Sequence, residues 1–576
     1  MKDYLFIQDA HITRMNTHFS SLVHKRDMWL CGFEEFSYQR KDYAVVVDGE
    51  LYNESEIKEE LRQAQFPVME TIEEVFVYSY LHWGVDMYQH LIGAYGFVLL
   101  CEDHLIAMKD PLGLALMYYV NTEDSFIITN SIDLLLKNTR TKAVMGKQEI
   151  CNLFAFGPGM PMDQTILKHV QQLPMGSYLK KKENIEVQQY YQLKAKPHTD
   201  NLTDTIETVH DLLSDSIHRQ KAYAHASFLS GGLDSSIITA LCANKDDAWH
   251  TYSLEYEGNK ENFKGNLYQV ALDDDYIKQM LERYPTQHTT CTITQDELAQ
   301  RLKDAMLARG FPGMADIDSS LLWLCENVGS VDQVILSGEC SDEIFGGYPW
   351  FYRDELANLD TFPWLRSSDE RISLLHPQLQ SLDIKGHIQH LYESSIQDVT
   401  YLKSDSKEDR RARKQTVLCL QWFMQTLVVR QLAMAKASDI TIRAPFADVA
   451  LLEYVYNIPW NMKFYKQNEK GILRKAFEKQ LPHDVCWRKK NPFPKTHDPY
   501  YAELAAALVQ NCYEDKSSPL HQLFDDDALK QLIDTKGASF PLPWYGQLMS
   551  GPQLLAYLYQ IDCWMREYQV QIDLRA

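Results

Sequence analysis

A stretch of nine residues, Phe228–Ser236, constrains the fold of this chain more than any other part of it. The run Ala222–Leu229 reads as a buried strand, and the apolar residues Ile237–Cys242 continue as a helix. Between them, Gly231 and Gly232 permit a sharp turn and a close approach of the backbone to a ligand, because they have no Cβ. The stretch therefore predicts a strand, a tight turn and a helix whose N-terminus faces the turn.

The predicted turn carries groups that hold a phosphate. Free N–H groups at the helix start, together with the hydroxyls of Ser230, Ser235 and Ser236, form a cradle for an anion. Asp234 alone would repel a phosphate, so we expect a metal ion between the two. A Walker loop is excluded because no lysine follows the second glycine. The alternative is an ordinary strand–turn–helix corner with a capping serine, but S-G-G-x-D-S-S is more specific than a lone glycine pair.

A second stretch, Val334–Trp350, has the same plan. A buried strand ends in a glycine turn, and three carboxylates follow, those of Glu339, Asp342 and Glu343. Such a density of carboxylates beside a phosphate cradle favours magnesium, which takes oxygen ligands and substrate phosphates together. The alternative is the capped acidic start of a helix.

The two stretches resemble known signatures. The first is similar to the pyrophosphate-binding loop of enzymes that cleave ATP to AMP and pyrophosphate while adenylating an oxygen. The second resembles the S-G-E-x-[SA]-D-E-[IL]-F-G-G-Y signature of asparagine synthetases. This resemblance implies ATP and Mg²⁺ as cofactors, Asp234 and Asp342 as metal ligands, and Glu339 at the place where the nucleophilic amine arrives. It implies nucleotide contacts from the following residues: Phe228, Ser230, Gly231, Gly232, Asp234, Ser235, Ser236, Leu254, Ser337 and Gly338.

Composition limits the partners of the chain. Its 576 residues are too many for one ordinary core, so two or more domains are expected. The formal net charge is −22 without a basic stripe, which disfavours nucleic-acid binding. No stretch of 18 apolar residues and no signal-peptide pattern occur, so we expect no membrane association. The 11 scattered cysteines lack paired spacing, which fits reduced thiols in a cytoplasm.

Residues 1–195 read as a β-sandwich with a few helices. Strand patterns such as Tyr43–Val47 alternate with helical ones such as Thr71–Trp83. Three segments, Asp48–Asn53, Gly93–Phe97 and Asp110–Gly113, resemble landmarks of the glutaminase domain of glutamine-dependent asparagine synthetases. The resemblance implies an Ntn-hydrolase-like fold and a catalytic N-terminal cysteine.

The glutaminase landmarks are degenerate. The chain begins at Met1, and Cys31, which is followed by glycine as in the family's opening, would need removal of 30 residues to expose an α-amine. The family's N-G-E begins with Asp48 here, and its S-D-T-E has Ile72 in place of the aspartate. The arginine segment that precedes N-G-E in the family is also unrecognisable. We therefore expect the fold to be kept and the glutaminase reaction to be lost.

Residues 200–576 read as an α/β synthetase domain. Strands alternate with helices, as in a doubly wound parallel sheet that binds its ligand at the strand C-termini. The resemblance to asparagine synthetases covers this region strongly, includes Pro494–Pro499, and implies that Lys490 stabilises charge on the adenylated carboxyl and the departing pyrophosphate. A solvated surface lysine is the alternative. The family's segment D-R-x-S-M-A-S-G-L-E-V-R-V-P-F has Leu432-Ala433 and Thr441 at charged positions, so we expect an altered acceptor site.

These features favour an ATP-dependent, amide-forming ligase that acts without glutamine. Three substrates remain open: free aspartate with ammonia; a carboxyl and an amine of one molecule, as in β-lactam synthetases and lasso-peptide cyclases; and a peptide's carboxyl or carboxamide. We favour a specialised paralogue acting on a peptide or natural-product precursor, and family resemblance makes a homodimer possible. The alternative of another class is a non-catalytic regulatory protein, which would not be expected to keep both acidic glycine signatures.

Overall fold

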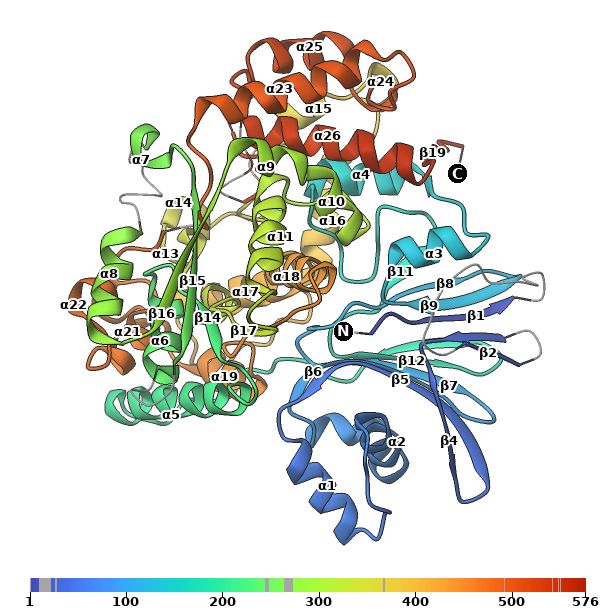
Figure 1. The fold of residues 1–576 in the computed structure, drawn as a ribbon, viewed down its shortest axis with the longest axis vertical. Coiled ribbons are helices and arrows are strands. Elements are labelled where there is room, and N and C mark those ends of the chain that lie inside the picture. The colour runs from blue at the N-terminus through green and yellow to red at the C-terminus, as the bar shows by residue number, and fades with distance from the viewer. Residues whose placement is uncertain are drawn as a thin grey trace. The chain divides into compact units, whose positions relative to one another are not determined.

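The computed structural model describes residues 2–9, 22–25, 28–243, 248–263, 273–365, 368–491, 493–540, 542–546, 549 and 551–575. The chain forms two compact units (Figure 1). The first contains Met1–Glu149, Met160–Leu193 and Gln571–Ala576, and the second contains Ile150–Gly159 and Lys194–Val570. The sequence predicted a single boundary between residues 195 and 200. Two short segments depart from it: residues 150–159 precede this boundary but belong to the second unit, and residues 571–576 follow it but belong to the first.

The first unit is built from two six-stranded sheets, whose orders are β11-β8-β9-β1-β3-β2 and β13-β12-β7-β6-β5-β4. All pairings within the two sheets are antiparallel. Its elements are β1 (Leu5–Asp9), β2 (Leu22–Lys25), β3 (Met28–Cys31), β4 (Glu34–Tyr38), β5 (Lys41–Leu51), α1 (Glu54–Gln63), α2 (Ile72–Trp83), β6 (Gly93–Leu100), β7 (Leu105–Lys109), β8 (Tyr118–Asn121), β9 (Ser125–Thr129), α3 (Ile132–Asn138), β10 (Val144–Met145), β11 (Val170–Gln172), β12 (Ser177–Lys181), β13 (Ile185–Gln189) and β19 (Gln571–Ile572).

Strand β5 shows why this unit is a sandwich. Successive side chains of a strand point to opposite faces of the sheet. Val46 joins Phe6 and Leu30 of the other sheet in one buried cluster, whereas Val45 and Val47 pack in a second cluster with side chains of α1 and α2. Both faces of the strand are covered, which accounts for its continuous apolar run. The predicted β-sandwich with a few helices, and the α/β class of the whole chain, are confirmed.

The second unit contains a five-stranded sheet of order β16-β15-β14-β17-β18, in which every pair of neighbours is parallel. Its strands are β14 (Ala226–Phe228), β15 (His250–Tyr256), β16 (Gln287–Ile293), β17 (Val334–Leu336) and β18 (Thr441–Arg443). After β14 the chain adds β15 and then β16 at one edge of the sheet, and after β17 it adds β18 at the other edge. The sheet therefore has its topological switch point between β14 and β17, where open α/β sheets bind their ligands.

Helices lie on both faces of this sheet, with α5 and α6 on one face and α11 and α18 on the other (Figure 1). The helices of the unit are α4 (Lys147–Phe156, from Ile150 onward), α5 (Leu202–Gln220), α6 (Leu233–Cys242), α7 (Asn259–Asn262), α8 (Asp274–Arg283), α9 (Gln295–Gln300), α10 (Leu302–Arg309), α11 (Asp316–Val328), α12 (Ser341–Phe345), α13 (Pro349–Tyr352), α14 (Asp354–Ala357), α15 (Ser368–Ser373), α16 (Ile384–Ile396), α17 (Lys407–Leu418), α18 (Gln425–Ala437), α19 (Val449–Asn457), α20 (Trp460–Lys463), α21 (Gly471–Phe477), α22 (His483–Cys486), α23 (Pro499–Glu514), α24 (Leu520–Leu523), α25 (Asp526–Asp534) and α26 (Pro552–Glu567).

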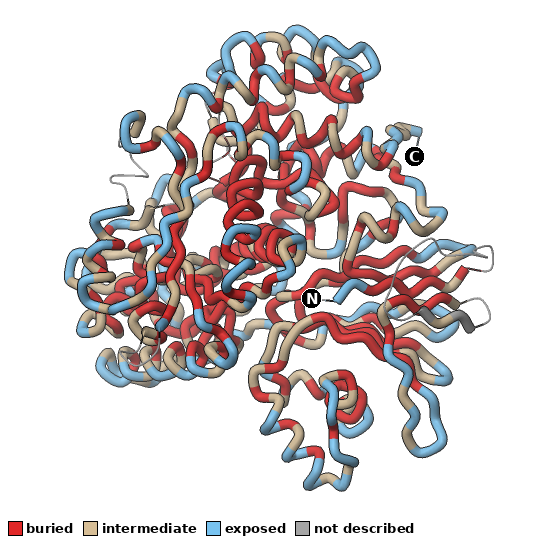
Figure 2. The backbone as a smooth tube through the Cα atoms, in the orientation of Figure 1, coloured by how far each residue is buried: buried red, intermediate tan, exposed pale blue. Residues whose placement is uncertain are grey.

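The predicted strand Ala222–Leu229 is shorter in the structure, where β14 begins at Ala226. Tyr223 has a left-handed backbone (φ 61°) and is 89% exposed, so the chain turns there before it enters the sheet. Inside the sheet, Ala226 and Ser227 of β14 are buried between the two neighbouring strands, whereas the edge strand β16 is mostly exposed or half-buried. Figure 2 shows buried residues along the inner strands of both units.

One helical stretch among the described residues, Lys407–Ala437, is long and apolar enough to cross a membrane. It runs through α17, a π-helical segment (Cys419–Met424) and α18. Of its most apolar window, 67% is buried inside the protein, as in the core helix of a globular domain. The 11 cysteines, all of them described, form no disulfide with one another.

Candidate active site

The switch point brings the two glycine motifs together. The turn after β14 and the turn after β17 leave the sheet side by side, because these strands are parallel neighbours. Gly338 lies so close to the first motif that a Cβ on it would be 2.9 Å from the Cβ of Asp234. Gly231 has φ +64°, and a Cβ there would meet Tyr276 at 2.7 Å. Both glycines are therefore required by the geometry of the turn and the close approach of the two loops.

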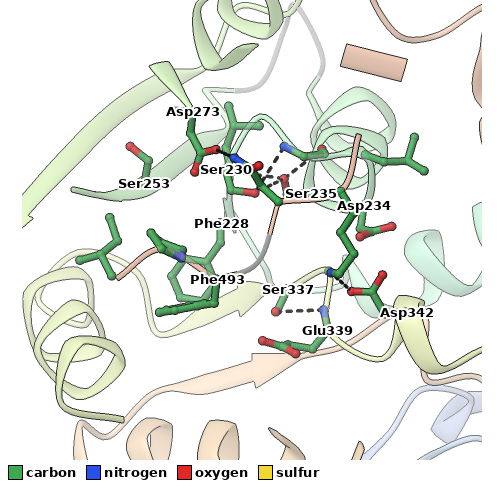
Figure 3. A pocket seen from close by; sticks show the side chains of 18 of the residues that line it. Phe228, Ser230, Asp234, Ser235, Ser253, Asp273, Ser337, Glu339, Asp342 and Phe493 are labelled. Atoms are coloured by element: carbon green, nitrogen blue, oxygen red, sulfur yellow. Dashed lines mark hydrogen bonds and ion pairs between the residues drawn. The ribbon is translucent and has the colours of Figure 1, made fainter. Parts of the chain in front are cut away.

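A cavity of about 300 Å³ opens at these turns, entirely within the second unit. Figure 3 shows Asp234 and Asp342 on one side of it, Phe228 and Phe493 on the other, and Ser337 with Glu339 at its base. The predicted site residues that line it are Phe228, Ser230, Gly232, Asp234, Ser235, Leu254, Ser337, Gly338, Glu339, Asp342 and Lys490. Residues from four distant parts of the sequence thus meet in one place.

Two predicted nucleotide contacts, Gly231 and Ser236, do not line the cavity. Gly231 is part of the turn, but it packs against Tyr276 and does not face the cavity. Ser236 lies inside α6, fully buried, and its hydroxyl has no hydrogen-bond partner among the described residues. Its place in the sequence suggested a phosphate contact, but the helix turns its side chain inward.

Serine hydroxyls hold the first turn in shape. Ser235 Oγ accepts a hydrogen bond from the Ser230 amide at 3.2 Å and lies 3.2 Å from Ser230 Oγ. The Gly232 amide donates to Ser230 Oγ at 3.4 Å. The turn leads into α6, a helix of ten residues, and the first residues of this helix, Leu233, Asp234 and Ser235, line the cavity. This arrangement can receive an anion at the helix N-terminus.

Two lysines sit among the acidic residues of the motifs. Lys470 Nζ lies 2.7 Å from Asp234 Oδ2, 2.6 Å from Asp342 Oδ1 and 3.2 Å from Ser341 Oγ. Lys490 Nζ pairs with the other oxygen of Asp342. The two carboxylates and the two ammonium groups therefore form one network in which Asp342 is the shared partner.

Burial and charge act in opposite directions on this network. Burial by itself would raise the pKa of Asp342, but the Lys470 and Lys490 ammonium groups outweigh it and hold the pKa well below its usual range. Burial likewise would lower the pKa of Lys490, and the Asp342 carboxylate reverses the effect and raises it. Both groups are thus charged at neutral pH. Next to them, burial and the Asp342 charge raise the pKa of Glu343 to about 7, and Tyr348 donates a hydrogen bond to Glu343 at 2.6 Å.

The residues present fit a magnesium ion that arrives with a nucleotide. Asp234 and Asp342 converge on one point, which the Lys470 ammonium already marks as a position for a cation. The described residues contain no group of three or more histidine, cysteine, aspartate or glutamate side chains that could hold a metal alone. Magnesium usually takes one or two carboxylates and completes its shell with water and substrate phosphates. Two carboxylates beside a phosphate cradle meet that requirement.

Glu339 has a partner that the sequence did not suggest. Arg430 Nη2 lies 2.6 Å from Glu339 Oε1, and the Arg430 guanidinium lies 4.8 Å from the centre of the Phe493 ring. The Arg430 side chain is 2% exposed. Two cations of the site, Lys470 and Arg430, were not among the predicted site residues. The run Lys470–Lys475 resembles the C-terminal region of asparagine synthetases, which was the available signal for Lys470, whereas nothing in the helical pattern marks Arg430.

None of the three departures in the expected acceptor segment lines the cavity. Ala433 is buried in the core cluster between α18 and the sheet, and Leu432 and Thr441 also lie outside the cavity wall. From the same helix, Leu427, Arg430 and Gln431 line the cavity. The prediction that Leu432, Ala433 and Thr441 themselves alter the grip on the acceptor is not supported by their positions.

Comparison with known proteins decides the family. The profile of the asparagine synthase family matches residues 208–566, and that of a glutamine amidotransferase domain matches residues 26–191. The chain is 38% identical over 551 residues to asparagine synthetase (glutamine-hydrolyzing) 3 of Bacillus subtilis, covering 94% of this chain and 89% of that protein. This chain belongs to the asparagine synthase family.

More distant relatives have other names. Asparagine synthetase (glutamine-hydrolyzing) 1 of Bacillus subtilis is 23% identical, covering 80% of this chain and 77% of the relative. Amidase chyE of Penicillium rubens is also 23% identical, covering 89% and 83% of the two chains. Membership of the asparagine synthase family makes this protein an ATP-dependent ligase and confirms the predicted pair of an Ntn-type amidotransferase domain and a pyrophosphatase-loop synthetase domain.

In the amidotransferase unit of this asparagine synthase homologue, residues at and near the landmark positions are ion-paired, hydrogen-bonded or buried. Lys2 Nζ pairs with Glu73 at 2.5 Å and with Glu34 at 3.0 Å. Asp48 is buried and accepts a hydrogen bond from Asn130 at 2.7 Å. Cys31 lies in β3 with no exposed surface, and burial raises the pKa of its thiol to about 12. The reactive form of a thiol is the thiolate, which burial disfavours at Cys31.

Proposed function

We propose that this protein adenylates a carboxyl oxygen with ATP, releases pyrophosphate, and forms an amide or a related product as AMP leaves. It does so without hydrolysing glutamine. One observation supports this proposal: next to the serine–glycine turn, two carboxylates and two ammonium groups form one ion-pair network, made of Asp234, Asp342, Lys470 and Lys490. Binding and cleavage of a triphosphate require both an anion cradle and fixed cations, and these lie together here.

The side chains would divide the work as follows. The turn and the N-terminus of α6 bind the phosphates, and the backbone near Leu254 meets the adenine. Asp234 and Asp342 would hold magnesium, which when bound neutralises phosphate charge. Lys470 and Lys490 leave the carboxylates and turn toward the departing pyrophosphate, where their charges stabilise the leaving group. Glu339 accepts the proton from the attacking nitrogen in the second step.

The decisive experiment is exchange of labelled pyrophosphate into ATP, together with AMP formation, over a panel of carboxylic acids. An adenylating ligase incorporates label into ATP once its acid is supplied. A regulatory protein that only kept the fold would give neither exchange nor AMP with any acid. That result would refute the proposal.

Glutamine is expected not to serve as the nitrogen donor. Burial raises the pKa of the Cys31 thiol, and the Lys2 ammonium forms an ion pair with the Glu73 carboxylate in the amidotransferase unit. Incubation with ATP and glutamine should release glutamate only at background rate, while ammonia supports any turnover. As an independent readout, Cys31 should resist iodoacetamide in the native protein and react after denaturation. Robust glutamate release, or rapid native labelling of Cys31, would contradict this prediction.

The second candidate is ammonia-dependent asparagine synthesis. The 38% identity to asparagine synthetase 3 of Bacillus subtilis favours it. We propose instead a specialised paralogue that acts on a peptide or natural-product precursor in the cytoplasm, with no nucleic-acid or membrane partner. The apolar residues of the cavity wall beside Glu339, Phe423 and Leu427, support this choice.

A further inference from the structure

One face of a single continuous helix forms the cavity wall beside Glu339. Its lining residues are Phe423, Leu427, Arg430 and Gln431, at spacings of four, three and one. These are the spacings of one face of a helix. Phe423 comes from the π-helical segment between α17 and α18. Single π-helical turns within α-helices are rare overall, but those that do occur often lie at functional sites.

This wall carries very little charge. Arg430 is its one charged side chain among the four, and Glu339 already neutralises it. Gln431 donates a hydrogen bond to the Ile442 carbonyl at 3.2 Å. Phe423 and Leu427 present a ring and methyl groups. Further apolar lining comes from other elements: Met314, Leu321, Leu324, Ile442 and Phe493.

The cavity is therefore divided by chemistry. Lys470 and Lys490 lie on the phosphate side with Asp234 and Asp342. On the other side, the Arg430–Glu339 pair lies beside the Phe493 ring and the apolar wall residues Phe423 and Leu427. Free aspartate brings an ammonium group and a second carboxylate beside the carboxyl that reacts. Each would need a buried partner of opposite charge, because an unpaired charge in such surroundings is costly.

We propose that the carboxyl group activated here belongs to a molecule with an apolar group, an aromatic ring or an aliphatic chain, that lies against Phe423 and Leu427. This inference rests on the proposed adenylation and names the class of acid that it takes. A free monocarboxylic acid and the C-terminus of a peptide share this chemistry, and the experiment separates them.

The test measures binding by calorimetry to enzyme saturated with magnesium and α,β-methylene-ATP, so that the nucleotide side is filled. The probes are acetate, butyrate, hexanoate and 3-phenylpropionate, with succinate and L-aspartate as charged counterparts and N-acetylglycyl-L-phenylalanine as the peptide. Affinity should rise by about fourfold for each added methylene. We expect 3-phenylpropionate to bind at least tenfold more tightly than L-aspartate. Tighter binding of the peptide than of 3-phenylpropionate would identify the peptide as the source.

Three results would overturn the inference. The first is an affinity that does not grow along the series, including 3-phenylpropionate that fails to bind. The second is tighter binding of L-aspartate or succinate. The third is competition between 3-phenylpropionate and the nucleotide analogue, which would assign the apolar wall to the adenine.

Variants locate the effect. Leu427→Asn should remove most of the gain per methylene, because it replaces methyl groups of the wall by an amide. Val331→Asn is the matched control, since Val331 is 63% exposed, and it should preserve the series. Thermal melting checks that both variants fold, and an undiminished series in Leu427→Asn would refute the placement. Failure of the nucleotide analogue to bind would instead refute the proposed function. Pyrophosphate exchange with L-aspartate, without 3-phenylpropionate binding, would leave adenylation standing and reject only this inference.

Discussion

Asp342→Asn is expected to reduce AMP formation by about a thousandfold or more, which corresponds to ~4 kcal/mol of transition-state stabilisation. Asp342 is the common partner of Lys470 and Lys490, and it would hold magnesium with Asp234. Loss of its charge removes a metal ligand and leaves the buried Lys470 and the half-buried Lys490 without their shared carboxylate. Asp234→Asn should show a similar kinetic loss. The measurement is AMP release with whichever acid supports exchange.

The same substitution should also lower the free energy of unfolding. Removing one partner of a buried ion pair costs on the order of 3 kcal/mol, and the Asp342 side chain is 15% exposed. Asp360→Asn is a suitable control, because the Asp360 side chain is 93% exposed, and it should change neither quantity. Near-normal turnover in Asp342→Asn or Asp234→Asn would show that the metal assignment is wrong.

Lys490→Ala is expected to slow adenylation by a hundredfold or more, because the departing pyrophosphate loses a fixed cation. Lys470→Ala should have a comparable effect, since its ammonium reaches both metal-binding carboxylates. Glu339→Gln should behave differently and reduce amide formation more than exchange, because its expected role is to accept the proton of the nucleophile. Pyrophosphate exchange and product formation, measured side by side, distinguish the two classes.

Lys479→Ala, at an exposed position outside the cavity, serves as the control for these lysines. Equal loss of both reactions in Glu339→Gln would place its action on ATP or on the metal and would reject its assignment to the second step. Such a result would also be informative about Arg430, whose guanidinium loses its partner charge in that variant.

Several parts of the fold and site could be predicted because their causes are local. A buried strand, a glycine turn and a helix start are encoded by consecutive residues. The local structure of the two motifs, Phe228–Ser236 and Val334–Trp350, could therefore be predicted from the sequence. Their meeting at the switch point follows from the parallel order of the sheet, which the alternation of strands and helices indicated. Eleven of the thirteen predicted site residues line the cavity for this reason.

Tertiary structure alone decided which charges meet and which helix face looks inward. Lys470 and Asp234 are 236 positions apart, and Arg430 and Glu339 are 91 apart, so no local pattern could pair them. Successive residues of a helix point about 100° apart. Gln431 therefore lines the cavity while Leu432 does not, and Ser236 turns inward although Ser235 faces the turn. The sequence by itself determined the chemistry of the phosphate side of the cavity. The apolar wall depends on which face of α18 points into the cavity and on the π-helical turn before that helix.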